Sequence, residues 1–154
     1  MTSLPRDQRT PWPRLLNGAL LVFLGGMLGA LLRISFTVDN LKFDDFIATD
    51  STNLIGTMFA NILGTFTLAL IAGARAGQPA TAKGDAAWLF FGVGLLGGFT
   101  SYSAVASIVA INLDHGNLLW LETGMLTVLF GLAAAALGWW LGRTFGRRAN
   151  GGRA

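Results

Sequence analysis

Two glycines and three aliphatic hydroxyl residues interrupt a long apolar stretch, within the segment Gly97–Ser103. Irregular backbone at membrane depth survives only where it is buried in protein or lines a wet cavity. A broken helix frees carbonyl oxygens, which suit a hard monovalent cation, while hydroxyls and the positive edges of aromatic rings suit a small anion. No Asp, Glu, His or Cys is close by in the sequence, so a tight divalent metal site is not expected. The segment predicts an ion-binding or conduction element.

A second polar group precedes this segment. Thr57, Asn61 and Thr65 recur every four residues and form one polar stripe on a helix. Beside it runs a stripe of small residues, which lets two helices approach closely: Gly56, Ala60 and Gly64. Asn61 has two interpretations, a hydrogen-bonding residue between helices or a donor to a permeating anion. The companion polar segment at similar depth favours the second.

The last apolar stretch contains weaker signals. Thr123 and Thr127 could extend a hydroxyl track, although such residues often bond their own i−4 carbonyl. Glycines seven apart predict a packing seam there: Gly124, Gly131 and Gly138.

Arg33 is the one basic residue inside a predicted span. Such a group marks function or snorkels to the interface. No nucleophile–base pair can be assembled within the spans, so we do not expect an enzyme.

Composition identifies the elements that must position these residues. The chain has 154 residues, of which 53% are hydrophobic and 12% charged, whereas soluble domains carry about 25% charged residues. The basic residues flank apolar spans and form no patch, so a nucleic-acid partner is not expected. The chain contains no cysteine, which excludes disulfides and thiolate metal sites.

Four apolar spans predict an all-α integral membrane protein whose third helix is broken at mid-membrane, at Gly97–Ser103. Each has the roughly 20 residues that cross about 30 Å of hydrocarbon: residues 15–36, 54–74, 86–113 and 118–142. They form one transmembrane domain, 15–142. It lies between a cytoplasmic N-terminal tail (1–14) and a basic C-terminal tail (143–154).

The distribution of Lys and Arg predicts the orientation. Nine lie on the side of the two termini and two near the other side, so both termini are expected in the cytoplasm. The nine are Arg6, Arg9, Arg14, Arg75, Lys83, Arg143, Arg147, Arg148 and Arg153, and the two are Arg33 and Lys42.

In order and spacing, three segments resemble the Fluc/CrcB family of fluoride channels: Gly25–Arg33, Gly56–Gly64 and Gly97–Ser103. The resemblance implies four-helix subunits joined as an antiparallel dimer, with two fluoride pores and a structural sodium ion at the dimer interface. Backbone carbonyls of Gly97 and Thr100 would hold the sodium.

The resemblance also assigns residues to the pore. Asn61 would be the pore asparagine, and Arg33 the family's arginine after the first glycine motif. The remaining pore positions would be Ser101, Tyr102, Ser103 and, more loosely, Thr123 and Thr127.

One departure concerns the aromatic lining. Tyr102 and Val105 stand where the family has phenylalanines, and an aliphatic side chain offers no positive ring edge to fluoride. Together with the unbalanced basic residues, this predicts pairing with a paralogous subunit of opposite orientation.

The resulting hypothesis is a passive fluoride-selective channel subunit in a bacterial-type plasma membrane, which exports fluoride and confers fluoride resistance. Its partners are fluoride, membrane lipid and the second subunit. Two alternatives stay open: a non-conducting or half-active partner subunit, and a small four-helix multidrug-type exporter. The exporter would need a central membrane carboxylate, which the first three spans lack.

Overall fold

The computed structural model describes residues 12–37, 51–79, 81–114 and 119–151, and within these ranges every regular element is a helix. Four helical segments are long and apolar enough to cross a membrane, which confirms the predicted all-α membrane fold. The elements are α1 (Trp12–Thr37), α2 (Ser51–Arg75), α3 (Ala82–Ala87), η3 (Trp88–Leu96), α4 (Gly97–Phe99), α5 (Tyr102–Asp114) and α6 (Leu119–Gly151). The third span consists of α3, η3, α4 and α5.

Helix α6 is longer than its predicted span. It continues past Gly142 as far as Gly151, through part of the predicted basic tail. Arginine has a high helix propensity, and cations near a helix C-terminus interact favourably with the helix dipole. Most of the acidic connection between the first two spans, and the turn with His115, lie outside the described residues.

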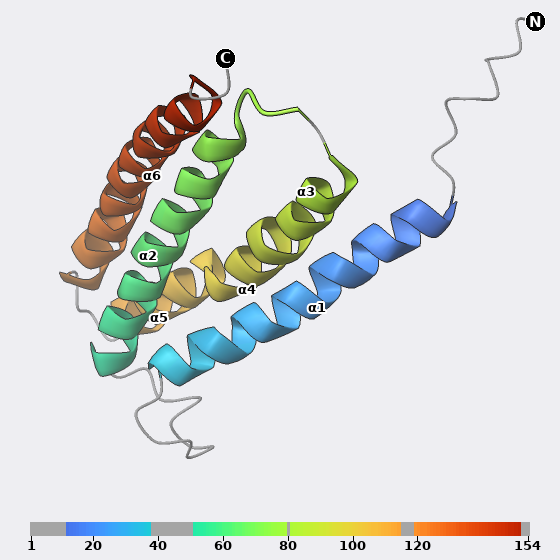
Figure 1. Cartoon of the computed structure of the whole chain (residues 1–154). Helices are drawn as coiled ribbons and strands as arrows, with labels where there is room; N and C mark the ends of the chain where they lie inside the picture. The colour runs from blue at the N-terminus through green and yellow to red at the C-terminus, as the bar shows by residue number, and fades with distance from the viewer. Residues whose placement is uncertain (1–11, 38–50, 80, 115–118, 152–154) are drawn as a thin grey trace, which may run out of the picture.

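Helix α2 occupies the centre of the bundle. It packs along α6 on one side and also contacts α1, η3, α4 and α5. On the other side, α1 runs alongside η3 and α4 (Figure 1). The C-terminal ends of α2 and α6 lie at the same end of the molecule as the start of α3 (Figure 1). The central position of α2 places its polar stripe among the other spans.

Glycines bring α6 into backbone contact with α2. A Cβ at Gly138 or Gly142 would collide with the carbonyl oxygens of Phe66 and Leu70, and one at Gly146 would lie 2.6 Å from the Ala74 oxygen. The seam therefore repeats every four residues. Of the glycines predicted to form a seven-residue seam, Gly138 alone packs against α2: a Cβ at Gly131 meets nothing within 4 Å, and Gly124 packs instead against Val109 of α5.

A second glycine seam joins α1 to the third span. Gly25 and Gly29 lie against the carbonyls of Phe90 and Leu95. In return, Gly94 and Gly98 lie against α1, so both helices contribute small residues. Without a hydrophobic force between helices in lipid, such close van der Waals packing is a main source of association.

Apart from the seam glycines, few residues are buried within one chain, and several of them lie in the middle of the third span. The described buried hydrophobic residues are Ala60, Leu96, Phe99 and Val105, and the buried polar ones are Thr57 and Thr127. Large apolar side chains elsewhere on the four spans are exposed, as expected where the solvent is lipid. Leu96, Phe99 and Val105 therefore place part of the interior beside the Gly97–Ser103 segment.

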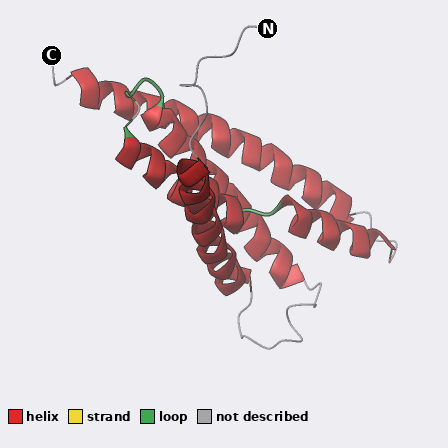
Figure 2. Ribbon diagram, turned by 90° about the vertical axis from the view of Figure 1, so that its right-hand side faces the viewer, coloured by secondary structure: helices red, strands yellow, loops and turns green. Residues whose placement is uncertain are grey.

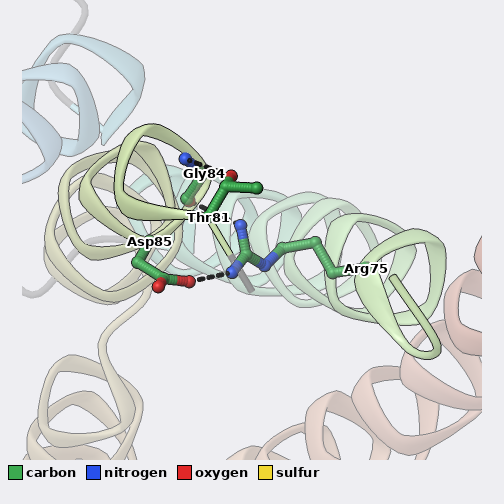
Figure 3. A network of polar contacts seen from close by, with 4 residues as sticks. All are labelled: Arg75, Thr81, Gly84 and Asp85. Carbon is green, nitrogen blue, oxygen red and sulfur yellow. Dashed lines mark hydrogen bonds and ion pairs between the residues drawn. The ribbon is translucent and has the colours of Figure 1, made fainter. Parts of the chain in front are cut away.

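Arg75 fastens the end of α2 to the start of α3. Its guanidinium donates to the Gly84 carbonyl and, at 2.8 Å, to the Asp85 carboxylate, as Figure 3 shows. The guanidinium carbon also lies 5.6 Å from the centre of the Trp88 ring. Thr81 begins α3 by accepting a hydrogen bond from the Gly84 N–H (Figure 3). This corner fixes the direction in which the third span enters the bundle.

Candidate functional site

The third span is broken midway, as predicted, but over fewer residues. Helix α4 ends at Phe99, α5 begins at Tyr102, and Thr100 between them is extended with φ −83° and ψ 143°. In Figure 2, the break is the short green loop near the centre of the picture, between the two helical pieces of the third span. Gly97 and Ser103, the predicted ends of the interruption, lie within the flanking helices.

Two side chains satisfy backbone groups at the break, one at the end of α4 and one at the start of α5. The Leu96 carbonyl accepts from both the Thr100 N–H and the Thr100 hydroxyl, each at 3.0 Å. Ser101 precedes α5 and accepts from the Ala104 N–H at 3.3 Å, which is the bond made by an N-cap residue. Thr100 and Ser101 therefore satisfy polar groups that breaking a helix inside a membrane exposes.

Asn61, on the central helix α2, hydrogen-bonds the backbone at the break. Its side-chain oxygen accepts from the Ser101 N–H at 2.6 Å, and its side-chain nitrogen donates to the Ser101 carbonyl at 3.1 Å. The amide orientation is forced, because a backbone N–H can only donate and a backbone carbonyl can only accept. One amide hydrogen is used in this bridge, and the group carries a second.

These bonds change the partners of two backbone carbonyls. In a continuous helix, the Gly97 and Thr100 carbonyls would accept from the N–H groups of Ser101 and Ala104. Here the Ser101 N–H donates to Asn61, and the Ala104 N–H donates to the Ser101 hydroxyl. Both carbonyls therefore lose their ordinary helical partners. A Cβ at Gly97 would meet nothing within 4 Å, so space is open beside that residue.

The break presents two opposite partial charges. The C-terminal end of α4 carries the negative end of a helix dipole and freed carbonyls, while the N-terminal end of α5 carries positive charge and free N–H groups. Carbonyl oxygens suit a monovalent cation, and N–H and O–H donors suit an anion. Among the described residues, no three His, Cys, Asp or Glu side chains gather into a metal-binding group.

The other predicted residues of the third span differ in exposure. The Ser103 and Ser101 hydroxyl oxygens are 3.1 Å apart, which extends the network that begins at Asn61. The Tyr102 side chain is 74% exposed, whereas Val105 is 4% exposed. Beside these two residues, a largely apolar cavity of about 280 Å³ lies between α5 and α6.

The remaining predicted site residues are Thr123 and Thr127 on α6 and Arg33 on α1. Thr127 is buried, and its hydroxyl donates to the Thr123 carbonyl at 2.9 Å, which is the i−4 bond considered as an alternative. The hydrogen of the Thr127 hydroxyl is therefore already used. Arg33 is half-buried near the C-terminal end of α1.

Two features of the site were not predicted. Residues Trp88–Leu96 form a π-helix, a rare geometry that is frequent at functional sites. Gly64 supports the break, because a Cβ there would lie 2.5 Å from the Thr100 methyl and 3.1 Å from the Phe99 ring. The predicted small-residue stripe on α2 contained the signal for this contact, but its target could not be read from α2 alone.

With the four spans and the break described, comparison with known proteins identifies the family. The family described as CrcB-like protein, Camphor Resistance (CrcB), matches residues 20–139. The chain belongs to the CrcB-like family. This membership confirms the resemblance, and the match includes all three segments on which it was based.

Relatives in this family bear a functional name. The chain is 37% identical over 134 residues to the fluoride-specific ion channel FluC of Hyphomonas neptunium. The alignment covers 83% of this chain and 97% of that protein. It is 34% identical over 137 residues to fluoride-specific ion channel FluC 2 of Corynebacterium jeikeium, covering 80% and 78%. It is 34% identical over 125 residues to FluC of Helicobacter pylori strain G27, covering 79% and 90%.

Proposed function

We propose that this chain is a subunit of a fluoride-specific ion channel, which conducts fluoride passively out of the cytoplasm and thereby confers fluoride resistance. Membership in the CrcB-like family carries this proposal, because relatives covering most of the chain are named fluoride-specific ion channels. The same membership disfavours a multidrug-type exporter and a subunit without a conducting role.

The break supports the proposal chemically. Fluoride is small and strongly hydrated, so a narrow pore must replace its water with hydrogen-bond donors. The second amide hydrogen of Asn61, the hydroxyls of Ser101 and Ser103, and the positive N-terminal end of α5 are such donors within one network. We propose that fluoride passes beside this network. Tyr102, Thr123 and Thr127 are proposed to line other parts of its path, and Arg33 to lie near it.

Passive conduction is sufficient for export. A negative membrane potential favours outward movement of an anion by roughly 2.3 kcal/mol per charge per 100 mV. The chain is a multi-pass membrane protein. We place it in a bacterial-type plasma membrane with both termini in the cytoplasm, on the excess of Lys and Arg at that side.

A structural sodium ion is the cofactor we propose. The freed carbonyls of Gly97 and Thr100, at the negative end of α4, have the oxygen chemistry that a hard monovalent cation needs. The open space beside Gly97 is compatible with such an ion at a boundary between subunits. A sodium ion there would be coordinated by carbonyl oxygens that the broken helix leaves without their usual hydrogen-bond partners.

We further propose an antiparallel dimer with a paralogous subunit. Tyr102 is 74% exposed on the single chain, which suits an aromatic ring that contributes to a shared pore. Val105 lacks a ring and is buried, so one of two pores would lack an aromatic contribution from this chain. A partner of opposite orientation would supply the missing ring.

Reconstitution tests the main proposal. Liposomes loaded with potassium fluoride and containing this chain with its paralogue should release fluoride when valinomycin is added, as measured with a fluoride electrode. Liposomes with the chain alone should release less than a tenth as much. Matched chloride-loaded liposomes should release far less chloride. Substituting Tyr102 by Ala should slow release at least tenfold, whereas substituting Thr67, whose hydroxyl bonds its own helix at Leu63, should change release less than twofold. Absence of fluoride release from both preparations would reject the proposed function.

A further inference from the structure

The exposed end of α6 carries charge and aromatic rings that the ion pathway does not use. Arg143, Arg147 and Arg148 are all exposed, as are Trp139 and Trp140. Among the described residues, none of the three arginines forms a salt bridge. From Gly142 to the last residue, the sequence contains four arginines and no acidic residue.

The geometry of α6 separates this surface from the helix seam. Trp139, Arg143 and Arg147 each follow a seam glycine by one residue, so they lie about 100° around the helix from the contact with α2. The Arg143 guanidinium lies 5.7 Å from the centre of the Trp139 ring. A guanidinium stacked on a ring still presents N–H donors at its edge, in the fork that matches a phosphate.

Membrane dimensions place the arginines at headgroup depth. Tryptophans are enriched at the boundary of the hydrocarbon core, and the headgroup layer is about 5–7 Å thick on each side. At 1.5 Å per residue, Arg143 lies about 4–5 Å beyond Trp140 along the helix, and Arg147 and Arg148 about 10–12 Å beyond it. The long side chains of the outer two arginines can reach back into the headgroup layer.

We propose that the basic end of α6, formed by Arg143, Arg147 and Arg148 with Trp139 and Trp140, binds the headgroups of anionic phospholipids. Charge complementarity selects this occupant over a zwitterionic lipid, because the surface holds three cations with no salt bridge in the described part of the chain, and none of its five residues is acidic. The aromatic rings then contact the upper acyl chain and glycerol region. Each arginine near an anionic membrane surface strengthens binding to that surface by roughly fivefold.

Tryptophan quenching by brominated lipid tests this surface on the full chain. The protein is placed in phosphatidylcholine bilayers that contain the same fraction of brominated phosphatidylglycerol or brominated phosphatidylcholine. We expect the wild type to prefer phosphatidylglycerol severalfold. The variant R143Q/R147Q/R148Q should show a preference near one, and R143K/R147K/R148K should keep most of the wild-type preference because it keeps the charges.

The control removes charge elsewhere on the same side. The variant R14Q/K83Q loses two exposed cations outside α6 and should keep the wild-type preference. An unchanged preference in the triple glutamine variant, or an equal loss in R14Q/K83Q, would overturn the assignment to α6. Abolition of the preference by millimolar inorganic phosphate, but not by chloride of equal ionic strength, would overturn the assignment to lipid and indicate a free phosphate.

Discussion

At the residue scale, Asn61 makes the interhelical hydrogen bonds of one interpretation, and its second amide hydrogen is compatible with the other. It is a hydrogen-bonding residue between spans, because both polar atoms of its amide bond the Ser101 backbone. The same bridge diverts the Ser101 N–H from the Gly97 carbonyl and leaves one amide hydrogen for another acceptor. A single side chain thus frees a carbonyl for the proposed cation site and keeps a donor for the proposed anion site. We treat these two roles as coupled.

We predict that Asn61→Ala removes the effect of sodium on thermal stability. Without the amide, the Ser101 N–H can return to the Gly97 carbonyl, which then no longer serves a cation. Loss of a partly buried hydrogen-bonded group should also lower stability by about 1–3 kcal/mol. The unfolding midpoint in detergent is measured in sodium and in N-methylglucamine at equal ionic strength. The wild type should unfold at higher temperature in sodium, and Asn61→Ala at the same temperature in both.

Thr67→Ala is the matched control, since it removes a polar group of the same helix that bonds only within that helix. It should keep the full sodium effect. An Asn61→Ala protein that responds to sodium as the wild type does would contradict the coupling. A wild type without any sodium response would contradict the sodium site itself.

The sequence predicted the residues of the break better than their contacts. Gly97–Ser103 could be found because it concentrates two glycines and several hydroxyl residues in an otherwise apolar run. The partners could not, because hydrogen bonds such as Asn61 to Ser101 depend on how two distant helices are placed. Val105 shows the same limit, since residue type alone did not indicate that this side chain is buried.

At the element scale, the α2–α6 seam is a contact that leaves no room for added volume. We predict that Gly142→Ala destabilises the protein by about 1–3 kcal/mol or more, because the new methyl would collide with the Leu70 carbonyl, and backbone cannot move aside cheaply. The loss is measured as a lower midpoint of thermal aggregation by fluorescence-detected size-exclusion chromatography. Lipid-solvated helices gain little from burial elsewhere, so the loss is not offset.

Gly18→Ala provides the comparison for this seam. Its Cβ would lie 3.5 Å from the Leu89 side chain, an ordinary contact with a flexible group. Alanine is also the better helix former, by up to about 1 kcal/mol. Gly18→Ala should therefore match or exceed the wild-type midpoint, and equal losses in the two variants would show that the seam is not close-packed.

The helices themselves follow from hydropathy, but their packing does not. Runs of about 20 or more predominantly apolar residues predicted four spans. The α2–α6 seam uses Gly138, Gly142 and Gly146, whereas the sequence suggested a seven-residue spacing, because a list of glycines does not show which helix face meets a neighbour. The π-helix at Trp88–Leu96 was also not predictable, since its apolar residues fit an α-helix equally well.

At the scale of the whole molecule, the excess of basic residues at one side predicts a single orientation. The chain has no cysteine, so a single introduced thiol reports the exposure of one position. We predict that Gly152→Cys in intact cells is protected from a membrane-impermeant maleimide and that Thr49→Cys is labelled. Permeabilised cells, in which both should react, are the control. Partial labelling at both positions would indicate insertion in two orientations.

A single orientation has a consequence for assembly. An antiparallel dimer of identical chains needs about half of the chains inserted each way, and nine cations against two oppose that. The chain expressed alone should therefore release less than a tenth of the fluoride that it releases when expressed with a paralogue of opposite charge bias, measured at equal protein mass in liposomes. Reversing the bias, by replacing Arg143, Arg147 and Arg148 with glutamine and adding lysines to the connection at residues 38–50, should raise the activity of the chain alone. Full fluoride release from the unmodified chain alone, together with one-sided labelling, would require a parallel assembly and would reject the paralogous partner.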